Sequence, residues 1–218
     1  MPKPGKARLN ILFIGNSFTS RNELPSLIAR IAVASNCQLT HHLITRGGAS
    51  LRMHWNGGAA AREITTGRYD FVVLQEQSTL PIKNAARMRE NVLLFDEMIR
   101  GAGSRTALYL TWARAHAPES QANITEAYTS LARETGATLI PAGVAWQMFM
   151  KRHDQPILHD RDGSHPTLAG SFLAACVAFR ALFHRAPEKL PELNAIKPED
   201  AARLDAVAAQ AMQAAAEA

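Results

Sequence analysis

Short apolar runs alternate with amphipathic segments along most of this chain, and this alternation limits the folds that it can adopt. Leu9–Ile14 is an apolar run closed by Gly15, and residues 70–74 (DFVVL) form another. Runs of this length, bounded by turn residues, are typical of buried strands. Between them, the apolar residues of Asn22–Asn36 recur at helical spacing. This order favours a parallel sheet with helices on both faces, because right-handed crossovers place each helix over the sheet.

The rest of the chain continues the same pattern. Strands are predicted over residues 9–14, 38–45, 70–74, 106–110 and 137–140, and helices over 22–36, 59–66, 84–100, 119–135, 144–152, 166–184 and 199–218. We therefore predict an α/β fold, a three-layer α/β/α sandwich around a parallel sheet of about five strands. A length of 218 residues, of which 47% are hydrophobic, is enough for one domain over residues 1–218. Residues 1–8 are expected to be flexible.

Charge and aromatic content argue against one large class of partner. The formal net charge is +5, which could attract nucleic acid. However, the basic residues are dispersed: Arg46, Arg52 and Arg62 alternate with apolar and acidic residues, and aromatic residues make up only 6%. Such a chain lacks the basic groove and aromatic platform that bind single strands. We expect a solvated basic surface and no nucleic-acid partner.

The sequence also bears on the compartment. The apolar run Leu9–Ile14 is too short for the core of a signal peptide and leads into Gly15-Asn16-Ser17 instead of a cleavage site. No stretch approaches the length that crosses a membrane. Cys37 and Cys176 lie in apolar, apparently helical settings; two buried thiols are expected, while a disulfide between them stays open. The cytoplasm is the expected location.

A serine directly after the first strand is the first candidate for chemistry. In open α/β sheets, ligands bind at the carboxyl ends of the strands, which here points to the loops 15–20, 46–51 and 75–80. Gly15-Asn16-Ser17 places the Ser17 hydroxyl at that rim. Taken alone, Ser17 is better explained as the cap of the helix that follows than as a nucleophile.

A histidine near the end of the chain changes this balance. Asp162-Gly163-Ser164-His165-Pro166 precedes the last core helix. Pro166 suits the first position of that helix, which would leave His165 near the N-cap, where the positive helix end disfavours imidazolium. Asp162, across a glycine-containing turn, can orient the imidazole. Ser17, His165 and Asp162 therefore supply a nucleophile, a base and an orienting carboxylate.

These segments, in this order, resemble the sequence blocks of the SGNH/GDSL hydrolase family. They are residues 11–19 (ILFIGNSFT), 46–51 (RGGASL) and 162–166 (DGSHP). The resemblance covers residues 9 to about 184. It implies a flavodoxin-like fold and hydrolysis of esters through an acyl-serine, without a cofactor. It also implies an oxyanion hole made by the N–H groups of Ser17 and Gly48 and by an amide side chain.

The chain departs from the family pattern at two blocks. The first reads Gly-Asn-Ser where Gly-Asp-Ser is commoner, a variation that leaves the nucleophile in place. The third block should carry an asparagine after a strand, but the chain has Gln75-Glu76-Gln77 there. A glutamine amide offers the same donor on a longer stem. We therefore expect Gln77, or else Gln75, to supply the third donor.

Other residues at the same rim are candidates for binding roles. Asn16 and Trp112 are candidates for lining the substrate pocket, although an indole covering the edge of the core explains Trp112 equally well. His153, His159 and Asp160 cluster in sequence with Asp162 and His165. The chain lacks a His-Glu-x-x-His helix and paired cysteines, so no metal site is expected.

The expected substrate is a small-molecule or carbohydrate ester with a short acyl group such as acetyl, because the chain is compact and has no obvious lid insertion. Two other functions stay open. One is an acyltransferase that uses Ser17 with an alcohol acceptor. The other is a non-catalytic carbohydrate-binding relative, against which the joint presence of Ser17, Asp162 and His165 argues.

Overall fold

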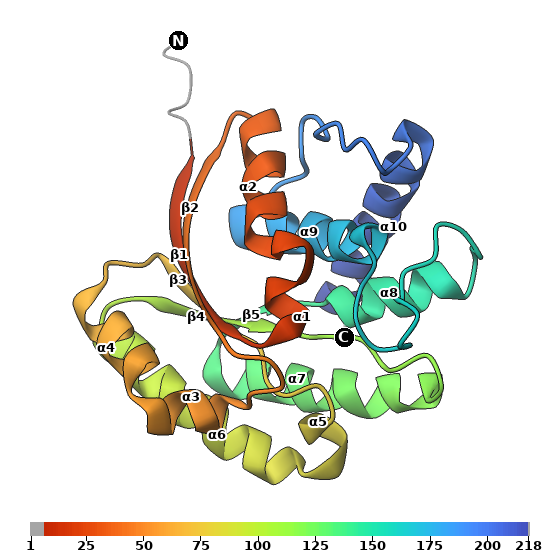
Figure 1. Ribbon diagram of the computed structural model, residues 1–218. Helices are drawn as coiled ribbons and strands as arrows, with labels where there is room; N and C mark the ends of the chain where they lie inside the picture. Colours follow the sequence, from red (N-terminus) through yellow and green to blue (C-terminus); the bar gives the residue numbers. More distant parts are fainter. Residues whose placement is uncertain (1–6, 218) are drawn as a thin grey trace.

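The computed structural model describes residues 7–217 (Figure 1). The expectation that residues 1–8 are flexible falls mainly on residues 1–6, which lie outside the described residues, as does Ala218. Arg8 already belongs to the first strand.

One parallel sheet forms the centre of the molecule, and its order is β2-β1-β3-β4-β5. Its strands are β1 (Arg8–Gly15), β2 (Gln38–Thr45), β3 (Phe71–Leu74), β4 (Arg105–Tyr109) and β5 (Thr138–Ile140). This is the flavodoxin-like order, in which the chain changes direction across the sheet next to the first strand. The predicted α/β fold with about five parallel strands is confirmed.

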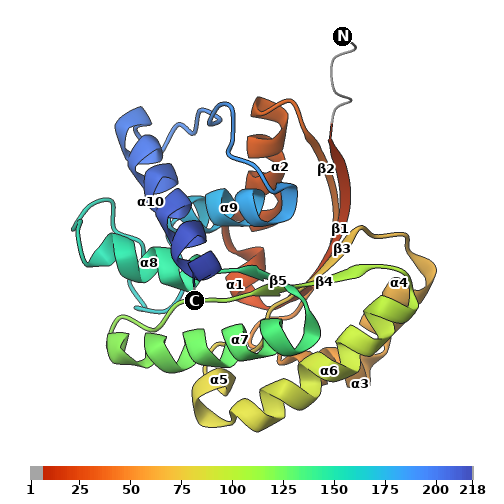
Figure 2. The ribbon, with the colours of Figure 1, turned by 180° about the vertical axis from the view of Figure 1, so that it is seen from behind.

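Helices cover both faces of the sheet, as Figures 1 and 2 show from opposite sides. One layer holds α2 (Leu24–Ala34), α8 (Ala142–Met150), α9 (Leu168–Phe183) and α10 (Pro198–Glu217). The other holds α3 (Leu51–Gly57), α4 (Ala59–Thr66), α6 (Ala85–Gly101) and α7 (Gln121–Thr135). Shorter elements are α1 (Ser17–Ser20), η1 (Arg21–Glu23), α5 (Leu80–Lys83) and η2 (Pro118–Ser120).

Two apolar cores follow from the alternation of side chains along each strand. Ile11 and Phe13 of β1 pack with α2 and α9, whereas Leu12 and Ile14 pack with the opposite helix layer. All four side chains are at most 1% exposed. Because residues 11–14 of β1 are buried on both faces, this stretch is continuously apolar, which is the pattern that predicts a buried strand.

The loops after β1 and β3 leave the sheet toward opposite faces. The chain passes from β1 to α2 in one layer and from β3 to α6 in the other, although β1 and β3 are neighbours. Such a divergence opens a crevice at the carboxyl ends of the two strands. The three loops expected at the site, 15–20, 46–51 and 75–80, therefore meet at one end of the sheet.

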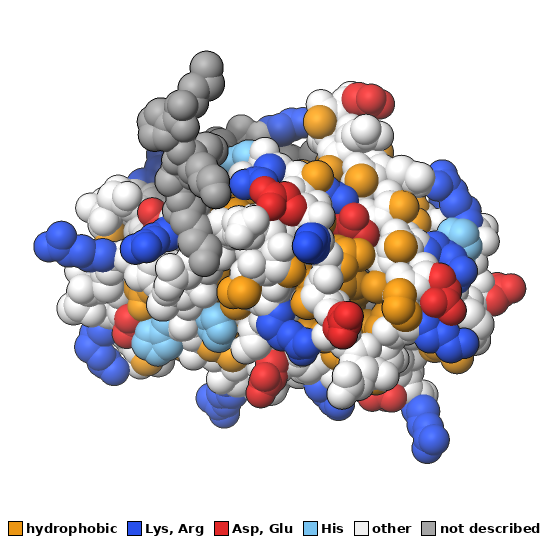
Figure 3. Space-filling view, turned by 90° about the horizontal axis from the view of Figure 1, so that it is seen from above, with side chains coloured by type: hydrophobic (Ala, Val, Ile, Leu, Met, Phe, Trp, Pro, Cys, Tyr) orange, Lys and Arg blue, Asp and Glu red, His pale blue; other side chains and the backbone are white. Residues whose placement is uncertain are grey.

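The charged surface residues, the two cysteines and the helix lengths bear on the remaining expectations. On the face shown in Figure 3, Lys and Arg side chains are interspersed with Asp and Glu. Cys37 and Cys176 are buried free thiols, so the disulfide that the sequence left open is not formed. Between residues 7 and 217, none of the helices combines the length and the apolar character needed to cross a lipid bilayer.

Candidate active site

Ser17 is the first residue of the short helix α1, directly after β1. Asn16 caps this helix: its Oδ1 accepts the N–H of Phe18 at 3.1 Å. Because Ser17 begins the helix, its own N–H has no acceptor within the helix. Its hydroxyl is partly buried and points toward the loop that carries His165. The capping role that competed for Ser17 therefore belongs to Asn16, and Ser17 is left with a free N–H and a directed hydroxyl.

Gly15 allows this turn because its neighbours leave no room for a side chain. A Cβ at this position would lie 2.6 Å from Oε1 of Gln75 and 2.7 Å from Oγ1 of Thr19. The same Gln75 oxygen accepts the N–H of Asn16 and the hydroxyl of Thr19, both at 2.9 Å. The β1–α1 turn is therefore held from below by a fully buried glutamine.

His165 connects Ser17 to Asp162. Its Nε2 lies 2.8 Å from the Ser17 hydroxyl oxygen, and its Nδ1 lies 2.5 Å from Oδ2 of Asp162. Oδ1 of Asp162 accepts the N–H groups of Ser164 and His165, both at 2.9 Å. The bond to the imidazole and these two N–H donors hold the pKa of the Asp162 carboxyl far below its usual value. An ionised Asp162 favours the tautomer with the proton on Nδ1, in which Nε2 accepts the hydroxyl proton of Ser17.

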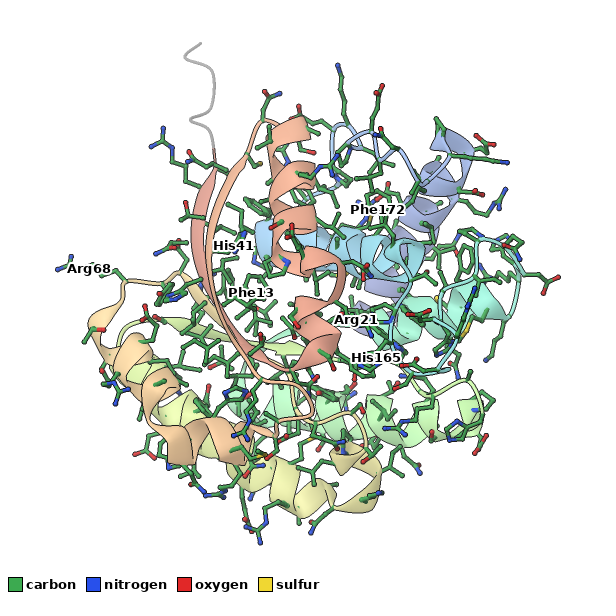
Figure 4. The ribbon with its side chains drawn as sticks, viewed as in Figure 1. Phe13, Arg21, His41, Arg68, His165 and Phe172 are labelled. Atoms are coloured by element: carbon green, nitrogen blue, oxygen red, sulfur yellow. The ribbon has the colours of Figure 1, made fainter. Side chains whose placement is uncertain are left out.

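Several backbone contacts hold the loop that carries this pair. Gly163 has a positive φ of 64°, which allows the tight turn between Asp162 and His165. The N–H of Ala115 donates to the carbonyl of Gly163 at 2.8 Å, and the N–H of Asp160 donates to the carbonyl of His165 at 2.7 Å. These contacts fix the backbone of the loop that carries the imidazole. Figure 4 shows His165 beside α1.

Helix α9 begins later than the sequence indicated. Thr167 is its N-cap, with Oγ1 accepting the N–H of Gly170 at 3.2 Å, and the helix starts at Leu168. Pro166 is therefore not its first residue; it forms an isolated bridge with His159. His165 therefore lies two residues before the N-cap, outside the helix.

The two residues proposed to line a substrate pocket are instead parts of the scaffold. Asn16 is 2% exposed, and its Nδ2 donates to the carbonyl of Ala49. Trp112 is 1% exposed, and its Nε1–H donates to the carbonyl of Ser164 at 3.0 Å. Its ring stacks on Trp146 with centroids 3.7 Å apart. Neither side chain is exposed enough to contact a substrate, so the expected lining role is corrected to a role in positioning the loops.

Gly48 lies in the exposed loop after β2. Its φ is +67°, a conformation that favours glycine, and a Cβ there would meet nothing within 4 Å. The next residue, Ala49, is tied to the nucleophile turn through Asn16 at 3.0 Å. The Gly48 segment and the Ser17 segment are therefore held together by one side-chain hydrogen bond.

The two glutamines of the third block have different surroundings. β3 ends at Leu74, so both Gln75 and Gln77 lie beyond the strand. Gln75 is 0% exposed, with Oε1 on the nucleophile turn and Nε2 on the carbonyl of Glu76. Because Gln75 is buried and both of its amide atoms are bonded within the protein, the structure does not support the alternative assignment of Gln75 to the oxyanion hole. Oε1 of Gln77 accepts the N–H and hydroxyl of Thr79 at 2.9 and 3.0 Å, and the residue is only partly buried.

The remaining histidines of the C-terminal cluster have protein partners. Nε2 of His159 donates to the carbonyl of Ala113 at 3.0 Å, and the ring of His153 packs on Phe149. Burial lowers the pKa of His159, which favours its neutral form. Among the described residues, no three His, Cys, Asp or Glu side chains converge in a way that could hold a metal ion.

Sequence reasoning missed two side chains that brace the site. Asn22 has a φ of +52°, and its Nδ2 donates to the carbonyl of Pro166 at 3.1 Å and to Oγ of Ser171 at 2.9 Å. Nε2 of His54 donates to the carbonyl of Gly15 at 2.7 Å. Asn is common at positive φ, but nothing in the sequence indicates these particular partners.

A third missed residue is Glu76, a carboxylate that stands between Gln75 and Gln77 after β3. It is 0% exposed. Buried carboxylates are rarely found without partners.

Several solved structures are similar to this chain in fold. The chain is 28% identical to a candidate SGNH hydrolase from Slackia heliotrinireducens, over 80% of this chain and 99% of that one, with a TM-score of 0.68. A protein of the DUF4886 family from Bacteroides uniformis is 20% identical over 94% and 95% of the two chains, with a TM-score of 0.78. An acetylxylan esterase from Geobacillus stearothermophilus is 14% identical over 86% and 98%, with a TM-score of 0.59. No protein-family model and no curated protein sequence matches the chain.

Proposed function

This chain belongs to the SGNH/GDSL hydrolase family, and on that premise we propose that it hydrolyses carboxylic esters through an acyl-Ser17 intermediate. The observation that carries the proposal is the continuous hydrogen-bonded series from the Ser17 hydroxyl through His165 to Asp162, with separations of 2.8 and 2.5 Å. This series joins residues 148 positions apart in sequence. A nucleophile, a base and an orienting group in contact are the requirement for this kind of catalysis.

The proposed reaction has two half-reactions. His165 takes the hydroxyl proton while Oγ of Ser17 attacks the ester carbonyl. The tetrahedral oxyanion is stabilised by the N–H groups of Ser17 and Gly48 and by the Gln77 amide. His165 then protonates the leaving alcohol as the C–O bond breaks, which leaves the acyl group on Ser17. In the second half, His165 deprotonates a water that attacks the acyl-enzyme, and the carboxylic acid leaves as Ser17 regains its proton.

The proposed acyl group is short, with acetyl as the reference case. Aromatic rings fill the volume behind the nucleophile: Phe18 is 4% exposed and stacks on Trp112 with centroids 5.1 Å apart. A long acyl chain would therefore lie along open surface, where it gains little from leaving water. The structurally similar acetylxylan esterase acts on an acetylated substrate by its name, and a carbohydrate or small-metabolite ester fits the same proposal. The buried free thiols Cys37 and Cys176 agree with a cytoplasmic location.

A chain-length series tests this substrate class. We expect kcat/KM for p-nitrophenyl acetate to exceed that for the octanoate and longer esters, since the stacked rings of Phe18 and Trp112 leave no room for extra methylenes behind the nucleophile. A preference for long chains would contradict the short-acyl proposal while leaving the serine mechanism intact. Adding a nucleophilic alcohol and analysing the products separates hydrolysis from acyl transfer, because a transferase yields mainly the new ester.

Gln77 is expected to supply the third oxyanion donor. Gln77→Ala should lower kcat for p-nitrophenyl acetate by about 10²–10³-fold with little change in KM, which is the typical effect of removing one side-chain donor. The loss falls on kcat because the donor acts mainly once charge has developed on the oxygen. Steady-state kinetics measures both constants.

Thr79→Val provides the matched control for Gln77. Thr79 donates to Oε1 of Gln77 through its N–H and its hydroxyl, at 2.9 and 3.0 Å. The variant keeps the N–H contact and should lose no more than about 10-fold, as expected for a single neutral hydrogen bond. If Gln77→Ala retains the wild-type kcat, the hole consists of backbone donors alone.

A further inference from the structure

Glu76 is a buried carboxylate that the proposed reaction does not use. It follows β3 closely, is 0% exposed and makes no hydrogen bond to Ser17 or His165. Burying a carboxylate is costly unless its oxygens are hydrogen-bonded. Glu76 meets this condition, because its oxygens accept hydrogen bonds from Leu51, Gln77 and Asn91, which lie in three separate segments.

Two of the donors belong to the loops that would hold the oxyanion. Oε1 of Glu76 accepts the N–H of Leu51 at 2.9 Å and the N–H of Gln77 at 2.7 Å. Leu51 begins α3, three residues after Gly48. One carboxylate oxygen therefore joins the segment that carries the Gly48 N–H to the backbone of Gln77, which carries the proposed third donor.

The other oxygen anchors this junction to the helix layer. Oε2 accepts Nδ2 of Asn91, on α6, at 2.8 Å. Oδ1 of Asn91 in turn accepts Nε of Arg52 at 2.9 Å. Burial raises the pKa of Glu76, while its three N–H donors and the nearby Arg52 charge oppose that shift. The direction of both hydrogen bonds is therefore fixed: Arg52 donates to Asn91, and Asn91 donates to Glu76.

We propose that Glu76 is a positioning residue for the oxyanion hole, which sets the distance between the Gly48 segment and Gln77 by binding both through one carboxylate. The inference rests on the proposed esterase function. Its physical basis is that a preorganised hole stabilises the transition state only when its donors are already in place, and that displacements of about 1 Å can cost on the order of 10²-fold in rate.

The direct test reverses one hydrogen bond. In Glu76→Gln, the new amide oxygen can still accept the N–H groups of Leu51 and Gln77, but the new NH₂ group then faces Nδ2 of Asn91, and two donors meet. Asn91 cannot rotate its amide without presenting the same group to Nε of Arg52. In the double variant Glu76→Gln/Asn91→Asp, the new carboxylate at position 91 accepts from both the new amide at position 76 and Arg52. The junction then re-forms with the total charge unchanged.

We expect Glu76→Gln to lower kcat for p-nitrophenyl acetate by roughly 10- to 10²-fold with KM nearly constant. The rate constant for labelling by a fluorophosphonate should fall in parallel, because the phosphonyl oxygen uses the same hole. The double variant should recover most of both rates. Wild-type kcat in Glu76→Gln, or a double variant as slow as the single one, would overturn the proposal.

A matched control separates positioning from loss of stability. Asp96, on α6, is a second buried carboxylate and is 5% exposed. Its Oδ1 accepts the hydroxyl of Thr106 at 2.7 Å, and among the described residues it makes no hydrogen bond to the oxyanion loops. Asp96→Asn should lower the unfolding temperature without lowering kcat at a temperature where the protein is folded. An equal fall in kcat for Asp96→Asn would make the Glu76 effect a general consequence of instability and overturn the proposal.

Two further measurements keep the outcome interpretable. If Glu76→Gln does not fold, Asn91→Ala removes the hydrogen bond that fixes Oε2 and so lets the carboxylate that binds both oxyanion loops shift. A lower kcat at unchanged KM is again expected, and an unchanged kcat would contradict the proposal. Wild-type protein without esterase activity would refute the proposed function, whereas an active wild type with an indifferent Glu76 would refute only the role of Glu76.

Discussion

Ser17→Ala is expected to lower kcat for p-nitrophenyl acetate by about 10⁶-fold, the scale on which removing the nucleophile acts in serine hydrolases. The variant keeps the backbone N–H groups at positions 17 and 48, so it retains substrate binding and part of the oxyanion stabilisation. It loses the covalent route, because a methyl group has no oxygen to attack the ester and no proton for His165 to accept. In the wild type, Nε2 of His165 lies 2.8 Å from the Ser17 hydroxyl oxygen. Steady-state rates of the purified variant, corrected for spontaneous hydrolysis, measure the effect.

Ser20→Ala is the matched control for this substitution. Ser20 ends the same short helix that Ser17 begins. The same chemical change three residues away should leave kcat within a few-fold of the wild type. If Ser17→Ala hydrolyses the ester as fast as Ser20→Ala, the nucleophile has been assigned to the wrong residue.

Asp162→Asn is expected to lower kcat by about 10⁴-fold, as in other hydrolases in which the orienting carboxylate becomes an amide. Two backbone N–H groups, from Ser164 and His165, donate to Oδ1 of Asp162 at 2.9 Å and would keep the amide oxygen on that side. The amide NH₂ would then face Nδ1 of His165, where Oδ2 now lies at 2.5 Å. This orientation favours the tautomer with the proton on Nε2, which cannot accept the proton of Ser17.

Asp160→Asn tests whether this loss is specific. Asp160 lies in the same loop, but its Oδ2 is 3.7 Å from Arg21 on the exposed surface, a kind of ion pair that contributes little. The variant should keep most of its activity at moderate ionic strength. Equal losses in the two variants would show that the loop needs negative charge in general, and not an orienting partner for His165.

Much of the fold could be predicted from local pattern because the sheet is buried on both faces. The predicted ranges of β2 and α4 coincide with the observed ones, and β1 differs by one residue at each end. The short helices α1, α3 and α5 were not predicted, since elements of four to seven residues carry too little periodicity. The start of α9 was misplaced because Thr167, and not the residue before Pro166, forms the cap.

The prediction of the site depended on different information. Ser17, Asp162 and His165 could be proposed because their motifs are local and their order along the chain is characteristic. The roles of Gln75 and Glu76 could not, because the partners that define them lie up to 59 residues away for Gln75 and up to 25 for the carboxylate of Glu76. Gln75 and Gln77 look equivalent in sequence, but in the structure Gln75 is buried and binds the β1–α1 turn, whereas Gln77 is partly buried and binds Thr79.

The central claim is that Ser17 is an activated nucleophile, and covalent labelling tests it without knowledge of the natural substrate. A fluorophosphonate transfers its phosphonyl group to an activated serine oxygen with loss of fluoride. We predict one added phosphonyl group per chain by intact-mass measurement, located on Ser17 by peptide mapping, and no labelling after Ser17→Ala. The rate of labelling should fall sharply in Asp162→Asn and remain nearly unchanged in Asp160→Asn. A wild-type protein that stays unlabelled under conditions that label a known serine esterase, or a label on another residue that persists in Ser17→Ala, would contradict the account.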